Sequence, residues 1–231
     1  MLPLRPRKSI YPNCQMKRAL FILLMACLSI SMKAQEVDMK PPTAFATWTD
    51  LIFRKDLGNW HVGGFVEYCT IDKFDGKGTV NDEIIIRPIL GYNPLNWLRF
   101  QFQVDVLYSF FGGLYLRYLP DVTFHWKAAD FRFSYRTRLQ LSHKIADGTL
   151  KPVIRSRLKA EYLVPKSPVS IHVAAEPYWL TSISKARYYA GVDVQVHKNV
   201  SITADYIRYA NYSATSAHSD VLSTALYIRF R

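Results

Sequence analysis

The stretch LRFQFQVDV at residues 98–106 places apolar side chains on every even position and polar side chains on every odd position. FRFSYRTRLQL at 131–141 and IRSRLKAEY at 154–162 alternate in the same way, with basic residues concentrated on one parity. Successive side chains of a β-strand point to opposite faces, so each stretch has one apolar face and one charged face. The apolar face is rich in aromatic and aliphatic residues, and the other is rich in arginine. This pattern is typical of a membrane β-barrel with lipid outside and a polar lumen inside.

The first 34 residues have the features of an export signal. They contain six basic residues and no acidic residue, and the basic MKR at 16–18 precedes the apolar ALFILLMACLSI at 19–30. That apolar run is too short to cross a bilayer, which needs about 20 residues, but it fits a signal peptide. We expect a signal peptide at 1–34 that is cleaved near Ala34, with residues 1–15 as an upstream extension. In an alternative interpretation, cleavage occurs before Cys27 and this cysteine carries a lipid anchor.

The charge of the chain gives little information about its partners. The formal net charge is +12, and half of this excess lies in the basic leader. A basic balance makes polyanions plausible partners, but the chain has no helix-turn-helix, zinc-finger or RNA-binding signature. Export also argues against such a partner, so we expect no nucleic acid. Cys69 is the only cysteine after the leader, so no internal disulfide is expected.

Residues 35–231 are predicted to form a single outer-membrane β-barrel domain. The expected fold class is all-β, an antiparallel transmembrane β-barrel of about twelve strands with no helical domain, and ten strands are the alternative. Eleven candidate strands are recognised, and a short strand at 36–44 would give the even number that bacterial barrels normally have. The candidates are 43–55, 60–70, 83–92, 97–109, 113–126, 130–143, 150–163, 168–180, 186–197, 199–210 and 220–230.

The connections between these strands alternate between tight turns and mostly longer, polar loops, as at 93–96 and 71–82. Outer-membrane barrels have short periplasmic turns and longer external loops, so the tight turns are assigned to the periplasmic rim. Aromatic residues at both ends of the strands agree with membrane interfaces; those beside the tight turns are Trp60, Tyr92, Trp97, Trp126 and Tyr162. Phe230 lies one residue from the end of the chain, near the place where the barrel-assembly machinery reads a terminal aromatic residue.

Parity places most of the charged residues in the lumen. The functional interpretation is a narrow anion-selective pore or a pocket for a ligand that bears phosphate or carboxylate. The alternative is a ladder of arginine–carboxylate pairs that fills a structural barrel. The candidate lumen-lining residues, offered as anion contacts, are Arg99, Arg117, Arg132, Arg136, Arg138, Arg155, Arg157, Lys159, Glu161 and Glu176.

Two other classes of protein are considered. A lipid hydrolase or acyltransferase would use Ser170 and His172 with Glu176, but these three residues share the inward parity, away from lipid. A soluble exported barrel that binds an apolar ligand would need the reversed orientation, with arginine outside and phenylalanine inside. We expect no catalytic residue, so the protein is not predicted to be an enzyme. The six dispersed histidines have no metal-ligand spacing, so no metal and no cofactor are expected.

The centre of the chain resembles a family of short exported outer-membrane barrels of Gram-negative bacteria that is known only as a domain of unknown function. The resemblance implies the barrel fold and the outer-membrane location, and it brings no catalytic residues. The implied partners are outer-membrane lipid and the assembly machinery, with a small anionic solute as a further candidate. The matching motifs are RTRL at 136–139, RSRLKAEY at 155–162, PKSP at 165–168, EPYW at 176–179, RYYAGV at 187–192 and HKNVSI at 197–202.

Overall fold

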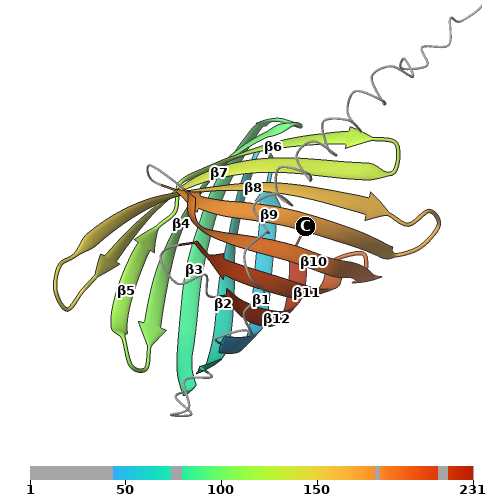
Figure 1. Cartoon of the computed structure of the whole chain (residues 1–231). Helices are drawn as coiled ribbons and strands as arrows, with labels where there is room; N and C mark the ends of the chain where they lie inside the picture. Colours follow the sequence, from blue (N-terminus) through green and yellow to red (C-terminus); the bar gives the residue numbers. More distant parts are fainter. Residues whose placement is uncertain (1–43, 74–79, 180–182, 213–217, 231) are drawn as a thin grey trace, which may run out of the picture. The chain divides into compact units, whose positions relative to one another are not determined.

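The computed structural model describes residues 44–73, 80–179, 183–212 and 218–230, and the expected signal peptide lies outside these ranges. The described residues form strands and connections (Figure 1), and none of them belongs to a helix that could cross a membrane. The strands are β1 (Ala44–Leu57), β2 (Trp60–Lys73), β3 (Val80–Leu95), β4 (Leu98–Ser109), β5 (Gly113–Tyr118), β6 (Asp121–Ala128), β7 (Phe131–Lys144), β8 (Leu150–Leu163), β9 (Val169–Trp179), β10 (Ile183–His197), β11 (Val200–Asn211) and β12 (His218–Phe230).

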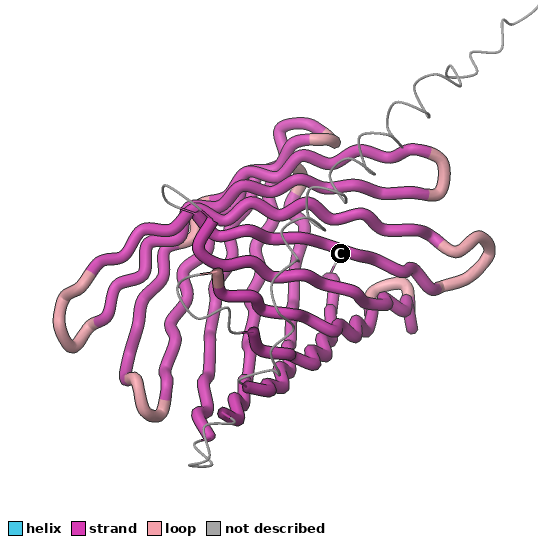
Figure 2. The backbone as a smooth tube through the Cα atoms, in the orientation of Figure 1, coloured by secondary structure: helices cyan, strands magenta, loops and turns pink. Residues whose placement is uncertain are grey.

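All twelve strands belong to one sheet that closes into a barrel, which confirms the predicted all-β barrel of about twelve strands. Each strand from β1 to β4 pairs with the next in antiparallel fashion. The same holds for each strand from β6 to β12. The ring is closed by β1 and β12, which run parallel, with Ala44 opposite Ser219 and Lys55 opposite Phe230. Figure 2 shows the loops at two opposite ends of the strands.

The predicted strand at 113–126 is broken in two. β5 pairs with one end of β4 and β7, while β6 pairs with the other end of the same two strands. The break falls at Leu119 and Pro120, and proline has no N–H with which to continue the ladder. Hydrogen bonds still cross the break, from Leu119 N to Gln103 O at 2.8 Å and from Leu139 N to Pro120 O at 3.0 Å. Twelve strands therefore occupy eleven positions around the barrel.

An odd number of positions explains the parallel closing pair, because an antiparallel ring closes on itself only when the number is even. The twelfth strand comes from the division of 113–126. The short strand proposed at 36–44 lies, except for its last residue, outside the described residues. β1 begins at that last residue, Ala44.

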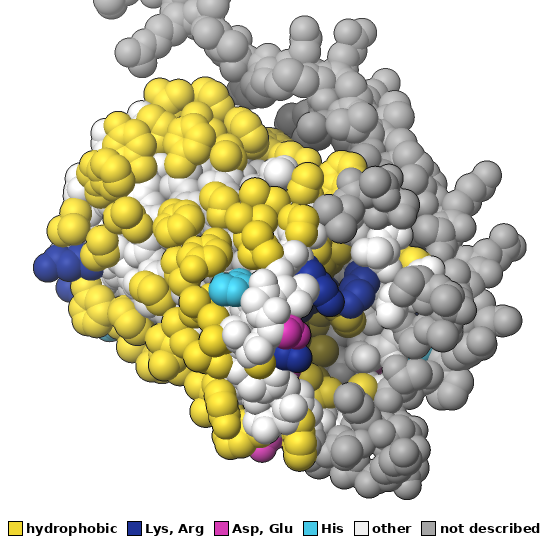
Figure 3. All heavy atoms as spheres, turned by 90° about the vertical axis from the view of Figure 1, so that its left-hand side faces the viewer, with side chains coloured by type: hydrophobic (Ala, Val, Ile, Leu, Met, Phe, Trp, Pro, Cys, Tyr) yellow, Lys and Arg dark blue, Asp and Glu magenta, His cyan; other side chains and the backbone are white. Residues whose placement is uncertain are grey.

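The alternation that predicts the fold is confirmed in β4. Phe100, Phe102 and Tyr108 are 45%, 47% and 48% exposed, whereas Gln103 and Asp105 are 3% and 1% exposed. Figure 3 shows hydrophobic side chains spread over the described part of this face, with few charged ones among them.

The interior is more apolar than parity alone predicts. One cluster of buried side chains on the inward face joins Phe65 of β2, Ile85 of β3 and Leu107 of β4. A second cluster joins Ala46 of β1, Ile207 of β11 and Val221 of β12. Charged side chains occur beside these clusters and also on the wall that β7, β8 and β9 form.

Aromatic side chains pair on the exterior beside the tight turns, as the sequence predicts. The ring centroids of Trp60 and Tyr92 lie 4.7 Å apart, and those of Phe131 and Tyr162 lie 5.1 Å apart. Phe133 also points outward but is 8% exposed, because it stacks on Trp126 with the ring centroids 5.6 Å apart. Four of the five connections at this rim contain two residues, which holds neighbouring strand ends close enough for these contacts.

Candidate functional site

Four arginines form a block on the inner face of β7 and β8. Arg136 lies directly opposite Arg157 in the register of the two strands, and Arg138 lies opposite Arg155. Side chains at paired positions have Cβ atoms about 4.5–5.5 Å apart, and like charges placed there repel. The block therefore requires carboxylates or another source of negative charge beside it.

Glu176 of β9 supplies one of these carboxylates. Arg136 donates from Nη2 to Oε1 at 2.5 Å, and Arg155 donates from Nη2 to Oε2 at 2.8 Å. Tyr189 of β10 adds a hydrogen bond from its hydroxyl to Oε2 at 2.9 Å. The Glu176 side chain has no exposed surface, so both of its oxygens are committed to partners inside the barrel. Arg136 reaches across β8 to make its contact.

Asp121 of β6 supplies the second carboxylate. Arg138 donates to Oδ2 from Nη2 at 2.7 Å and from Nε at 3.2 Å, and Gln103 donates to the same oxygen at 3.1 Å. Charge-assisted hydrogen bonds of this kind are stronger than neutral ones. Asp121 is the first residue after the strand break, so the break places this carboxylate on the inner wall opposite Arg138.

A third pair lies between β3, β4 and β5. Arg87 donates to Asp105 from Nε, and from Nη2 at 3.2 Å, while Arg117 lies 3.7 Å from the same carboxylate. The guanidinium of Arg87 also covers the ring of Phe65 at 4.2 Å. Arg87 is absent from the predicted set, because it lies in a continuous apolar run that has no alternation from which to assign its face.

The other predicted residues lie nearer the tight-turn rim. Arg132 contacts Glu161 at 2.6 Å with its side chain 52% exposed. Lys159 lies 3.5 Å from Asp193. Arg99 and Arg157 differ from the rest, because neither makes an ion pair with any residue that the structure describes and the Nε atom of each is buried without a hydrogen-bond partner. Seven of the ten predicted residues thus take part in close ion pairs, and Arg117 forms a longer one at 3.7 Å.

Arg187 of β10 is held by aromatic rings. Its guanidinium lies 4.9 Å from the ring centroid of Trp48, 5.4 Å from that of Tyr178 and 5.1 Å from that of Tyr209. Cation–π contacts of this kind stabilise a cation away from water. Trp48 is on β1, which is separated from β10 by β11 and β12. Arg187 therefore extends along the interior surface beyond its neighbouring strand.

The residues considered for acyl transfer do not form a catalytic arrangement. The Ser170 hydroxyl donates to Glu161 at 2.6 Å. His172 lies between two other carboxylates, with Nδ1 2.9 Å from Asp193 and Nε2 2.7 Å from Asp205. A serine nucleophile needs hydrogen-bond contact with its base, and each of these side chains has a carboxylate as its partner instead.

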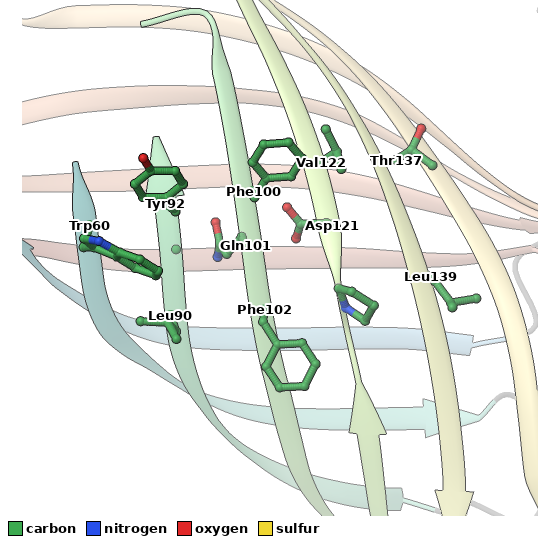
Figure 4. A pocket seen from close by; sticks show the side chains of 12 residues that line it. Trp60, Leu90, Tyr92, Phe100, Gln101, Phe102, Asp121, Val122, Thr137 and Leu139 are labelled. Carbon is green, nitrogen blue, oxygen red and sulfur yellow. The ribbon is translucent and has the colours of Figure 1, made fainter. Parts of the chain in front are cut away.

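Two hollows accompany these networks. A small pocket of about 150 Å³ lies inside the barrel between the inward side chains of Arg54, His61 and Arg99. An open groove of about 520 Å³ lies on the exterior beside the strand break. Figure 4 shows Leu90, Phe100 and other apolar side chains around this groove. No group of three potential metal-ligating side chains occurs among the residues that the structure describes.

Comparison with known proteins places the chain in a family. A search of curated proteins finds no match to this chain. A family model described as "Protein of unknown function (DUF2490)" matches residues 45–220, which include all of β2 to β11 and most of β1. Because the match covers more than half of the sequence, the chain belongs to this family of proteins of unknown function, DUF2490.

Proposed function

We propose that the protein is an outer-membrane β-barrel that forms a narrow passage for small anions. The observation that carries the proposal is the block of four arginines on β7 and β8, for which Glu176 and Asp121 are the only ion-pairing carboxylates among the described residues. Three of the arginines are ion-paired, and Arg157 is the fourth. A ring or wall of arginine side chains is a recognised way to select anions in a pore.

The exterior supports the membrane location. Leucine, phenylalanine and valine side chains on all sides of the barrel are exposed, including Leu51 of β1 at 40%, Phe102 of β4 at 47% and Val173 of β9 at 53%. Soluble monomers rarely expose a continuous apolar surface of this kind, whereas a lipid-facing barrel requires one. The basic and apolar leader expected at residues 1–34 also agrees with export, and the two-residue turns support a periplasmic position for one rim.

The width of the passage follows from the number of strands and from the buried network. Barrels of eight strands are filled by their side chains, whereas those of sixteen or more leave an aqueous channel. Eleven positions lie between these limits. Arg138, Asp105 and Glu176 are 4%, 1% and 0% exposed, so ion pairs occupy much of the central layer. Such a passage would admit inorganic anions and exclude larger solutes.

The complete burial of Glu176 also favours a second candidate, a barrel that serves as a structural element and does not conduct. Both of its oxygens are occupied by arginine side chains, so a layer of fixed ion pairs closes this part of the interior. Conductance separates the two candidates.

The location is tested by cell fractionation. The protein should be recovered with outer membranes and should migrate faster on gels when it is not heated, as folded barrels do. Recovery in the soluble periplasmic fraction without detergent would overturn the membrane assignment.

The passage is tested by planar-bilayer recording of the purified, folded protein in a gradient of potassium chloride. We expect a small conductance whose reversal potential has the sign that indicates a preference for chloride over potassium. In Arg157→Gln this reversal potential should shift towards zero. The matched control is Lys198→Gln, which removes one positive charge from an exposed two-residue turn. If the folded protein does not conduct, the structural barrel is the remaining candidate. A cation-selective conductance would refute the role of the arginine block.

A further inference from the structure

A small pocket inside the barrel gathers hydrogen-bond donors and no carboxylate. It has a volume of about 150 Å³ and lies close to the turn that joins β1 and β2. Its polar wall consists of Arg54, His61, Arg99, Gln101 and Tyr227, and the rest of the lining is Ile52, Phe53, Gly63 and Ile89. No acidic residue lines it, although β1, β2 and β4 all carry inward acids elsewhere.

His61 is fixed so that one ring nitrogen is an unused donor. The side chain is 1% exposed and lies against Gly91 of β3, where a Cβ atom would overlap the imidazole ring. Nδ1 lies 3.4 Å from the amide nitrogen of Asn93 and accepts its hydrogen. A neutral imidazole with an accepting Nδ1 carries its proton on Nε2. This Nε2 atom is buried and makes no hydrogen bond of normal length to a described residue, and the side chain of Gln101 is its polar neighbour in the pocket wall.

Arg99 brings a second unused donor and an uncompensated charge. Its Nε is buried without a partner, and it forms no ion pair within the part of the chain that the structure describes. The acid nearest in sequence to the pocket wall, Asp56, is outside the lining, and both of its oxygens are bonded to arginines, one of them Arg54 of the pocket. It accepts from Arg54 Nε at 2.8 Å and from Arg229 Nε at 2.6 Å. Arg54 lines the pocket, and its hydrogen bond to Asp56 uses only Nε.

We propose that this pocket binds a small oxyanion of the phosphate class. Buried donors that lack acceptors are costly, and an isolated buried cation is more costly still. An oxyanion would satisfy the donors of Arg99, Arg54 and His61 together, and arginine suits phosphate because its planar group donates two parallel hydrogen bonds. A water molecule takes about 30 Å³ in the liquid, so the pocket has room for inorganic phosphate or sulfate.

The position of the pocket links it to the passage proposed above. It lies between the tight-turn rim and the arginine block, and Arg99 and Arg136 both neighbour Thr123 in the register of β4, β6 and β7. The role of the pocket as an anion-binding site along that passage rests on the proposed function. Binding itself depends only on the pocket.

Isothermal titration calorimetry of the detergent-folded, full-length barrel tests the proposal, with inorganic phosphate as the probe in a chloride-free buffer. We expect one saturable site, with binding weakened at least ten-fold in Arg99→Gln. Sulfate should compete with phosphate. Glycerol phosphate tests whether the ligand is a free anion or a phosphate group on a larger solute. We expect it not to bind, because the pocket has room only for the free anion.

Two further variants keep the test independent of a folding defect in Arg99→Gln. Gly91→Ala displaces the His61 ring without changing any charge, and it should also weaken phosphate binding. Arg208→Gln removes an arginine from the exterior of β11, where Asp220 pairs with it, and binding should stay as in the unmodified protein. Heat-modifiable migration shows which variants are folded.

The outcomes separate the two proposals. Absence of a phosphate-dependent heat in the folded protein, or unchanged binding in both folded pocket variants, would overturn the phosphate site even if the barrel conducts chloride. A barrel that binds phosphate but conducts nothing would keep the site and refute the passage.

Discussion

Arg136 and Arg157 occupy directly opposed positions on β7 and β8, yet within the described ranges only Arg136 has a carboxylate partner. Glu176, which receives Arg136, also receives Arg155. One buried glutamate therefore compensates two cations. Among the described residues, the charge of Arg157 is stabilised only by carboxylates that it does not contact directly. This unequal sharing determines how the barrel should respond to substitutions.

Glu176→Gln should destabilise the barrel strongly, because it leaves Arg136 and Arg155 buried without a counter-charge. Removal of one partner from a buried ion pair typically costs about 3–5 kcal/mol. The free energy of unfolding, measured by tryptophan fluorescence in urea for protein folded into lipid vesicles, should fall by this amount. Asp220→Asn is the control, because its partner Arg208 is 38% exposed and exposed pairs contribute about 1 kcal/mol or less. Equal losses in the two variants would contradict the prediction.

Arg157→Met should raise stability while it lowers anion preference. The change removes a charge that has no carboxylate partner among the described residues and whose Nε is buried, and it keeps an unbranched side chain that fills irregular space. We expect a gain on the order of 1 kcal/mol in the same urea titration. If the variant is less stable than the parent protein, Arg157 has a stabilising partner, which an anion held in the interior would provide.

Phe102→Lys should hinder folding into lipid. Phe102 lies near the middle of β4 on the exposed face, and a lysine on the lipid face near the bilayer midplane costs about 2–4 kcal/mol. Asn96→Lys, in the two-residue turn before β4, should have little effect. A cost below about 0.5 kcal/mol for Phe102→Lys, which is typical of a surface substitution in water, would show that this face does not meet lipid.

Gly191→Ala should disturb the contact between His172 and Asp205. A Cβ atom on Gly191 would overlap the Asp205 carboxylate and lie 2.7 Å from the Ala204 carbonyl oxygen. We expect a loss of about 2 kcal/mol, within the range for overpacking. The double variant Gly191→Ala with Asp205→Ala should lose less stability than the two single variants lose together, because Asp205→Ala removes part of the overlap. Strict additivity would indicate that the two residues do not interact.

The sequence predicts the barrel well wherever one face of a strand is apolar and the other charged. The run at 98–106 corresponds to β4, with its orientation correct, because alternation reports directly on the two faces of a sheet. The run at 84–90 contains apolar residues on both parities, since Ile85 and Ile89 line an apolar part of the interior. Alternation is lost there, and Arg87 is missed for that reason.

Two other features depend on geometry beyond a single strand. Pro120 is visible in the sequence, but whether it ends a strand or interrupts one depends on the neighbours β4 and β7, which continue past it. The partner of each arginine depends on register, stagger and side-chain length. Arg136 faces Arg157 across the ladder and bonds instead to Glu176, which lies two strands away.

The parallel pairing of β1 with β12 has a practical consequence for labelling. Ala44 lies beside Ser219 and Phe230 lies beside Lys55, so the first and last residues of the barrel are separated by roughly 40 Å of strand. In the proposed membrane setting, peptide tags attached at these two positions would be accessible from opposite sides of the membrane. A circular permutant that joins them would need a linker long enough to traverse the full height of the wall, whereas an even-numbered barrel could be rejoined by a short loop.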